Sequence, residues 1–259
     1  MTLESYVLSE LLRQAGNHLW QSTIFAVVAF LLTLALRSTH ARARHWILLV
    51  ASLKFLVPFA LLAELGDLLG SRVVPAAPAA HIPLVVGQVM QPFALPEPVV
   101  PTLVAAPTHD LAFTIHAVVF VCWLAGFAAV LFHWWDRWRR ARAVVRAAVP
   151  LREGRAVDAL RRVRSKGVLR LPDIRLVSST ARMEPGIFGI FRPVLWLPDR
   201  IADHLSDTEL EAILAHELCH ARRRDNLAAA FHMVVEAVFW FHPLVWWLGV
   251  RMVEERERA

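Results

Sequence analysis

The sequence predicts a mainly α-helical membrane protein with three transmembrane helices and a cytoplasmic α+β domain. Of its 259 residues, 57% are hydrophobic and 19% are charged, and the mean hydropathy is +0.47. Such values are typical of a membrane protein that carries a soluble portion. The net charge of +6 could indicate nucleic-acid binding, but the arginines cluster beside apolar stretches. We interpret them as topology signals and membrane-surface contacts, and we expect no direct contact with nucleic acid.

An N-terminal pair of transmembrane helices is expected over residues 1–69. The first apolar stretch, 19–36, is long enough to cross a bilayer as a helix. A basic loop, 37–45, separates it from a second apolar stretch, 46–69, which contains Lys54. We expect Lys54 either to extend its amine toward the membrane surface or to face a protein interior.

Residues 70–110 are rich in proline and nearly free of charge, which predicts a loop without a core of its own. A third transmembrane helix is predicted over 111–135. Because lysine and arginine are enriched in cytoplasmic segments, the loop 37–45 and everything after residue 136 are expected in the cytoplasm. The N-terminus and the proline-rich loop are then outside, across a bacterial-type inner membrane. The arginines that follow the third span are Arg137, Arg139, Arg140, Arg142, Arg146, Arg152 and Arg155.

The predicted cytoplasmic domain, residues 136–259, opens with helical sequence. Strand-type patterns follow at 174–178 and 194–197. Pro193 and Pro198 flank the second of these and favour an edge strand. An edge strand could hold an extended peptide by strand addition, and a plain structural hairpin is the equally open alternative.

Residues 216–220 read His-Glu-Leu-Cys-His. On a helix, His216 and His220 lie one turn apart on one face, so both imidazoles can bind a single Zn²⁺. Glu217 is then placed to polarise a water molecule in the open coordination position. A capping-box sequence at 206–209 and an apolar stripe after it indicate that the motif is helical. The alternative is an ordinary amphipathic helix with two surface histidines.

The segment after the motif decides where a third ligand can come from, since a catalytic zinc normally takes three protein ligands. Residues 227–250 are apolar enough for a fourth transmembrane helix, which would put the acidic tail on the opposite side of the membrane. The break at 241–243 favours a membrane-apposed helical hairpin over 226–258 instead, because Pro243 suits the first position of a new helix.

Four carboxylates in this region are candidates for the third ligand. Spacing favours Glu257, because it ends a helix face that is otherwise apolar and a carboxylate there needs a partner or a metal. Glu236 is the rival, as a ligand or as a partner of an imidazole. The others, Glu254 and Glu255, are expected in a solvated charged end; the face that ends at Glu257 also contains Trp246, Val250 and Val253.

Five short segments, taken together, resemble those of a known protein family. They are His-Leu-Trp-Gln-Ser at 18–22, Ser-Leu-Lys-Phe at 52–55, the motif stretch 216–226, Phe-His-Pro at 241–243 and Arg-Glu-Arg-Ala at 256–259. Together they resemble the membrane zinc peptidases of the BlaR/MecR antirepressor type. The resemblance implies a gluzincin-like fold on the cytoplasmic side, with Glu257 as third zinc ligand and Glu217 as general base. It also implies that Asp225 supports an imidazole or caps a helix.

The resemblance implies an integral membrane zinc endopeptidase that cleaves itself or a cytoplasmic regulatory protein, such as a transcriptional repressor, in transmembrane signalling. Two alternatives stay open: a non-catalytic membrane signal transducer with a vestigial metal site, and a quality-control membrane gluzincin. The expected partners are the lipid bilayer and a cytoplasmic protein substrate, with a homodimer left open. Relatives that sense β-lactams carry an extracellular sensor domain. Since the sequence stops at Ala259, we expect a chain truncated before any such domain, or a short family member.

Overall fold

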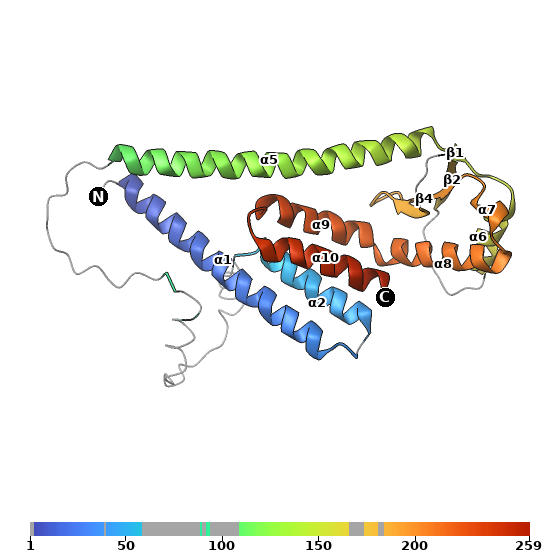
Figure 1. Ribbon diagram of the computed structural model, residues 1–259, viewed down its shortest axis with the longest axis horizontal. Coiled ribbons are helices and arrows are strands. Elements are labelled where there is room, and N and C mark those ends of the chain that lie inside the picture. The colour runs from blue at the N-terminus through green and yellow to red at the C-terminus, as the bar shows by residue number, and fades with distance from the viewer. Residues whose placement is uncertain are drawn as a thin grey trace, which may run out of the picture. The chain divides into compact units, whose positions relative to one another are not determined.

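The computed structural model describes residues 3–38, 40–58, 89, 92–93, 109–165, 174–180 and 184–259. Within these ranges the chain is mainly helical (Figure 1), as the sequence predicts. Most of the predicted loop 70–110, and the predicted second span from residue 59 onward, lie outside the described residues. The longer helices are α1 (Leu3–Ala35), α2 (Ala41–Lys54), α5 (His109–Ala147), α8 (Asp207–Arg223), α9 (Asp225–Val238) and α10 (Pro243–Glu257).

The chain divides into two compact units. The first contains Met1–Phe127 together with Val235–Ala259, and the second contains Ala128–Val234. The boundaries fall inside α5 and α9.

Two helices in the described part of the chain are long and apolar enough to cross a membrane. They are Glu10–Ala35 within α1 and Thr114–Ala147 within α5. The 14 described residues of α2 are fewer than the roughly 20 that a spanning helix needs. The third predicted span therefore coincides with a long helix, whereas the second is described only in part.

The helix α5 continues past residue 135, where the predicted span ends, to Ala147. Its arginines lie one turn after tryptophans and cover their rings: Arg139 over Trp135 at 5.2 Å and Arg142 over Trp138 at 4.7 Å. Such cation–π pairs at i and i+4 favour helix. The arginine-rich segment thus extends the helix beyond its apolar part.

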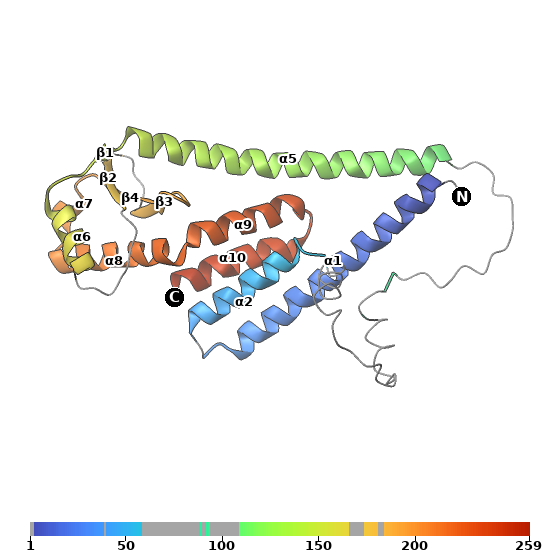
Figure 2. The same ribbon diagram turned by 180° about the vertical axis from the view of Figure 1, so that it is seen from behind.

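The first unit is organised around α2, which lies between α1 and α10 in both views (Figures 1 and 2). Small side chains of α1, Ala26 and Ala29, and of α2, Ala51, are at most 3% exposed. Small residues at a helix interface allow the two backbones to approach closely, which is typical of helix packing in membranes. Lys54 faces this protein interior, because its Nζ donates to Ser22 Oγ at 3.3 Å.

The apolar stretch 227–250 is not one continuous helix. It breaks between Val238, the last residue of α9, and Pro243, which occupies the first turn of α10. Thr23 of α1 donates its hydroxyl hydrogen to Leu19 O, so its oxygen accepts from His242 Nε2 at 3.0 Å. The break therefore lies where Phe-His-Pro predicts it, and His242 within it is bonded to α1.

The long helix α5 also contacts this break. Trp123 Nε1 donates to Val238 O at 2.9 Å, and Trp240 Nε1 donates to Trp123 O at 3.1 Å. A Cβ atom at Gly126 would lie 2.1 Å from the Trp240 ring. Glycine at 126 is what allows the indole to lie against the α5 backbone.

The second unit contains a four-stranded sheet in the described part of the chain. The strand order is β1-β2-β4-β3, with β2 and β4 parallel and the other pairs antiparallel. On one face, Leu195 and Leu197 of β4 join a core with α6 and α8, and on the other face Val194 and Trp196 pack toward the end of α5. The remaining bounds are β1 Val149–Pro150, α6 Arg155–Ser165, β2 Arg175–Ser179, β3 Gly186–Phe188, β4 Val194–Pro198 and α7 Ile201–His204.

The prediction that 194–197 forms an edge strand is wrong. β4 pairs with β2 on one side and with β3 on the other, and Val194 to Leu197 are all buried. An unbroken apolar run is typical of a strand covered on both faces. Pro193 and Pro198 are compatible with this position because they stand before and at the end of the strand. In the described part of the sheet, β3 is an edge strand instead.

Replacing Gly126 with valine should destabilise the protein, because the added carbons overlap the Trp240 ring. Overpacking of this kind costs about 1–3 kcal/mol. The thermal midpoint of the detergent-purified protein measures the loss. Gly186→Ala is the matched control, since a Cβ there meets nothing within 4 Å. Equal midpoints for the Gly126 variant and the parent would contradict the packing.

Candidate metal centre

The helix α8 carries the His-Glu-Leu-Cys-His motif, and local sequence explains why it is a helix. Ser206 and Glu209 form the predicted capping box: the Ser206 backbone N–H donates to Glu209 Oε2 at 2.9 Å, and the Glu209 N–H donates to Ser206 Oγ at 3.3 Å. Leu210, Leu214 and Leu218 recur every fourth residue and are fully buried against the sheet. These contacts fix the helix and its rotation about its own axis.

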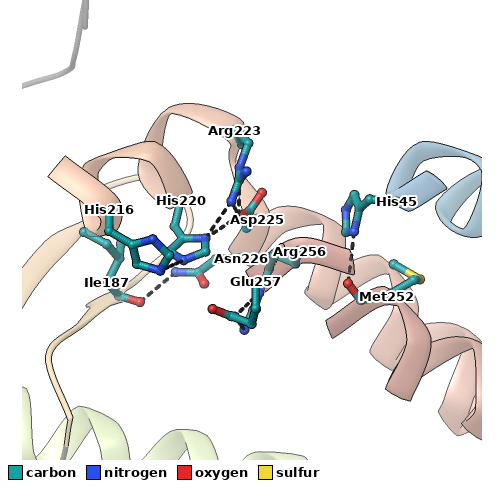
Figure 3. Close-up of polar contacts among 10 residues, drawn as sticks. All are labelled: His45, Ile187, His216, His220, Arg223, Asp225, Asn226, Met252, Arg256 and Glu257. Carbon is teal, nitrogen blue, oxygen red and sulfur yellow. Dashed lines mark hydrogen bonds and ion pairs between the residues drawn. The ribbon is translucent and has the colours of Figure 1, made fainter. Parts of the chain in front are cut away.

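The two histidines of the motif converge as their spacing predicts. Nε2 of His216 lies 3.0 Å from Nε2 of His220, and the two rings are nearly perpendicular (Figure 3). Two imidazole nitrogens on a tetrahedral zinc, each about 2.0–2.1 Å from the ion, lie roughly 3.3 Å apart. The donor atoms thus fit a zinc ion with little adjustment.

Asp225, the first residue of α9, orients one of these imidazoles. Its Oδ2 accepts from His220 Nδ1 at 2.6 Å and from Arg223 Nη2 at 3.1 Å (Figure 3). With the proton held on Nδ1, the lone pair of Nε2 points toward a metal. The carboxylate is only 5% exposed. Burial by itself would raise the pKa of Asp225, but the His220 hydrogen bond and the Arg223 charge outweigh it and hold that pKa below its usual value.

The connection between α8 and α9 brings Asp225 back to His220. Arg224 has φ +55° and ends α8 in the left-handed region, and α9 begins at the next residue. A residue in the left-handed region commonly ends a helix, so a second helix can begin directly after it. Asp225 is therefore the first residue of α9, and it supports an imidazole, which is one of the two roles that the family resemblance implied.

Asn226, which the sequence did not single out for a role, attaches the edge strand to this centre. Its Nδ2 donates to Ile187 O at 3.0 Å and to Gly189 O at 2.9 Å (Figure 3). Gly189 has φ +100°, and a Cβ there would lie 2.9 Å from Arg192 O. The turn after β3 thus needs glycine. A side-chain amide directly after the supporting aspartate is the signal that could have identified this residue.

The remaining predicted site residues have different environments. Glu217 lies on α8 between the histidines and is half-buried, and Glu236 is buried in α9. Glu257 is the last residue of α10 and is exposed, and its Oε1 accepts from Arg256 Nε at 3.0 Å and Nη2 at 2.8 Å (Figure 3).

The prediction of a solvated acidic end is wrong for Glu255, which is 7% exposed and paired with Arg44. The apolar face of α10 that ends at Glu257 is exposed rather than buried. Its residues Trp246, Val250 and Val253 are all exposed. The spacing correctly grouped these residues on one face, but the face that packs is the one with Val245, Leu248, Met252 and Glu255.

A helix with this motif, and with one imidazole supported by a carboxylate, is the arrangement used in metallopeptidase-type sites. The family model described as BlaR1 peptidase M56 matches residues 16–259. The chain therefore belongs to the BlaR1 peptidase M56 family, of the BlaR/MecR type.

Two curated relatives illustrate the similarity. Regulatory protein BlaR1 of Bacillus licheniformis is 40% identical over 73 residues, which are 28% of this chain and 12% of that protein. The methicillin resistance mecR1 protein of Staphylococcus aureus is 23% identical over 160 residues, or 59% of this chain and 27% of that protein. The aligned part thus covers only a minor share of the length of either relative.

Substitution of Asp225 by asparagine should weaken zinc binding by about 10- to 100-fold, the usual effect of removing a carboxylate that supports a ligating imidazole. Competition with a chromophoric chelator on the purified protein measures this affinity. Asp203→Asn, on an exposed position of α7, is the control. An Asp225 variant with the affinity of the parent would show that the carboxylate only caps α9.

Proposed function

We propose that the protein is an integral membrane zinc endopeptidase that cleaves itself or a cytoplasmic regulatory protein in transmembrane signalling. The observation that carries this proposal is the pair of imidazole nitrogens 3.0 Å apart on α8, one of them oriented by Asp225. Membership of the BlaR1 peptidase M56 family supports the same reaction class.

Glu257 is the proposed third ligand. Helices α9 and α10 contain 14 and 15 residues, which at 1.5 Å per residue gives about 21 and 22 Å. In the hairpin that the sequence predicts, two helices of nearly equal length would return the chain to the level at which the first of them begins. Glu254 and Glu255 are less suitable because they are already ion-paired with Arg251 and Arg44.

In the proposed reaction, Glu217 takes a proton from the attacking water and later delivers it to the leaving amine. A zinc ion held by His216, His220 and Glu257 would supply the Lewis acidity that polarises the scissile carbonyl and makes the water more acidic. Asp225 accepts a hydrogen bond from Nδ1 of His220, which would leave Nε2 of that imidazole available to the metal.

The edge strand β3 is the proposed support for the substrate peptide. It contacts the motif helix α8, and Asn226 binds one carbonyl group in the strand, Ile187 O, and one just after it, Gly189 O. A strand fixed in this way can present its remaining backbone groups to an extended peptide. This moves the predicted strand-addition site from 194–197 to Gly186–Phe188.

The proposed orientation places the second unit and the end of α10 in the cytoplasm, because the arginine-rich end of α5 leads into that unit. A cytoplasmic regulatory protein is then the accessible substrate. The names of the relatives, a regulatory protein and a methicillin resistance protein, are consistent with a repressor as substrate.

Replacing Glu217 with glutamine should reduce cleavage by at least about 10²-fold, since the general base is lost, while zinc content stays at that of the parent. Fragments of the chain itself, identified by mass spectrometry in membranes of expressing cells, measure cleavage. Glu211→Gln, on the same helix and ion-paired with Arg162, is the control. Undiminished cleavage by the Glu217 variant would contradict the mechanism, and a parent chain without any cleavage would favour a non-catalytic transducer.

Replacing Glu257 with alanine should remove most of the bound zinc, because two imidazoles alone hold the ion weakly compared with a three-ligand site. Glu236→Gln should retain it. Metal content by mass spectrometry on detergent-purified protein separates the two carboxylates. Loss of zinc from the Glu236 variant only would transfer the ligand role to α9.

A further inference from the structure

A buried ion pair joins the cytoplasmic end of α2 to the last turns of α10. Arg44 Nη2 and Nε lie 2.7 and 2.8 Å from Glu255 Oε2. Arg44 is 8% exposed and Glu255 is 7% exposed. Buried charges are rare unless they are paired, and removing one partner of such a pair leaves an uncompensated buried charge.

Arg44 also contacts the end of α1. Its Nη1 donates to Arg37 O at 3.2 Å and to Leu36 O at 3.4 Å, two carbonyl groups that follow the last residue of that helix. A single guanidinium thus connects three segments: the end of α1, the first turn of α2 and the last turns of α10. Only arginine has a planar set of five donors that can do this.

Two further contacts complete the attachment. His45 Nδ1 donates to Met252 O at 3.1 Å (Figure 3), one turn before Glu255. Arg258 Nη1 donates to Glu255 Oε1 at 3.2 Å, so both oxygens of that carboxylate are bound. The last turn of α10 is therefore fixed at residues 252 and 255.

Glu257 ends α10 two residues after Glu255. The last turn of a helix lacks part of its backbone hydrogen bonding and opens readily unless tertiary contacts hold it. Fixing Glu255 against Arg44 restrains the turn that carries Glu257.

We propose that Arg44 and Glu255 are a positioning pair: they hold the proposed ligand Glu257 in place and make metal affinity depend on how α1 and α2 are arranged. This inference rests on the proposed function, in which Glu257 binds zinc. α1 contains a candidate membrane span, so a signal that displaces it relative to α2 would disturb the Arg44 contacts and weaken the metal site. By linkage, zinc binding would in turn stabilise the same arrangement of the helices.

The chain offers a matched control one residue away. Arg251 Nη1 and Glu254 Oε2 form an ion pair at 2.5 Å within α10 itself, and each side chain is 38% exposed. Glu254→Gln removes the same charge from the same turn, but it breaks no connection between helices.

The test uses the full chain in detergent, with zinc affinity measured by chelator competition and ligand geometry by the visible spectrum of the Co²⁺-substituted protein. Arg44→Gln and Glu255→Gln should each weaken zinc binding by about 10-fold or more and alter the Co²⁺ spectrum. Arg44→Lys keeps the buried charge but loses the donors to the α1 carbonyls. It should give a folded protein, with the thermal midpoint as the check, whose affinity is still reduced. Glu254→Gln should match the parent.

The outcomes separate this inference from the proposal on which it rests. If Glu257→Ala loses zinc while the Arg44 and Glu255 variants bind like the parent, the positioning pair is refuted and the three-ligand site stands. If Glu257→Ala binds like the parent, the third-ligand assignment fails, and the positioning role fails with it. Equal weakening by Glu254→Gln would also refute the pair, because charge loss alone would then explain the effect.

Discussion

The hydrogen bond between His220 Nδ1 and Asp225 Oδ2, 2.6 Å long, is the contact on which the organisation of the site depends. It is possible because Arg224 adopts the left-handed conformation and lets α9 start directly after α8. The same turn places Asn226 on the carbonyl groups at β3. Two consecutive residues therefore link the His220 imidazole and an edge strand to the start of one helix.

The first unit contains several polar groups that lie between its apolar helices. His18 Nε2 donates to Phe55 O at 2.7 Å, and Lys54, Ser22, Thr23 and His242 bond to one another or to helix carbonyls in the same bundle. Where water is scarce, each such group needs a protein partner. The segments 18–22 and 52–55, distant in sequence, are thus hydrogen-bonded to each other, and His242 of 241–243 is bonded to Thr23, the residue after the first segment. These bonds give a structural reason for the motifs behind the family resemblance.

Local sequence was sufficient to predict the motif helix, its capping box, the convergence of His216 and His220 and the break before Pro243, because each depends on residues within one or two helical turns. Features that depend on distant partners were not predictable in this way. Glu255 appeared to belong to a solvated tail since its partner Arg44 lies 211 residues away in a stretch interpreted as a topology signal. Likewise, the prolines around β4 suggested an edge, whereas its pairing with β2 could not be inferred from sequence periodicity. Periodicity shows which residues share a face of α10, but the neighbours decide which face packs.

The most direct test of the account is X-ray absorption spectroscopy at the zinc edge on the purified full chain. The motif contains a thiol, Cys219, between the two histidines, so the ligand set is open to measurement. The proposed centre of His216, His220 and Glu257 predicts nitrogen and oxygen ligands only, at about 2.0–2.2 Å, with two imidazoles among them. A sulfur ligand at about 2.3 Å, or a zinc ion without two imidazoles, would contradict the proposed centre.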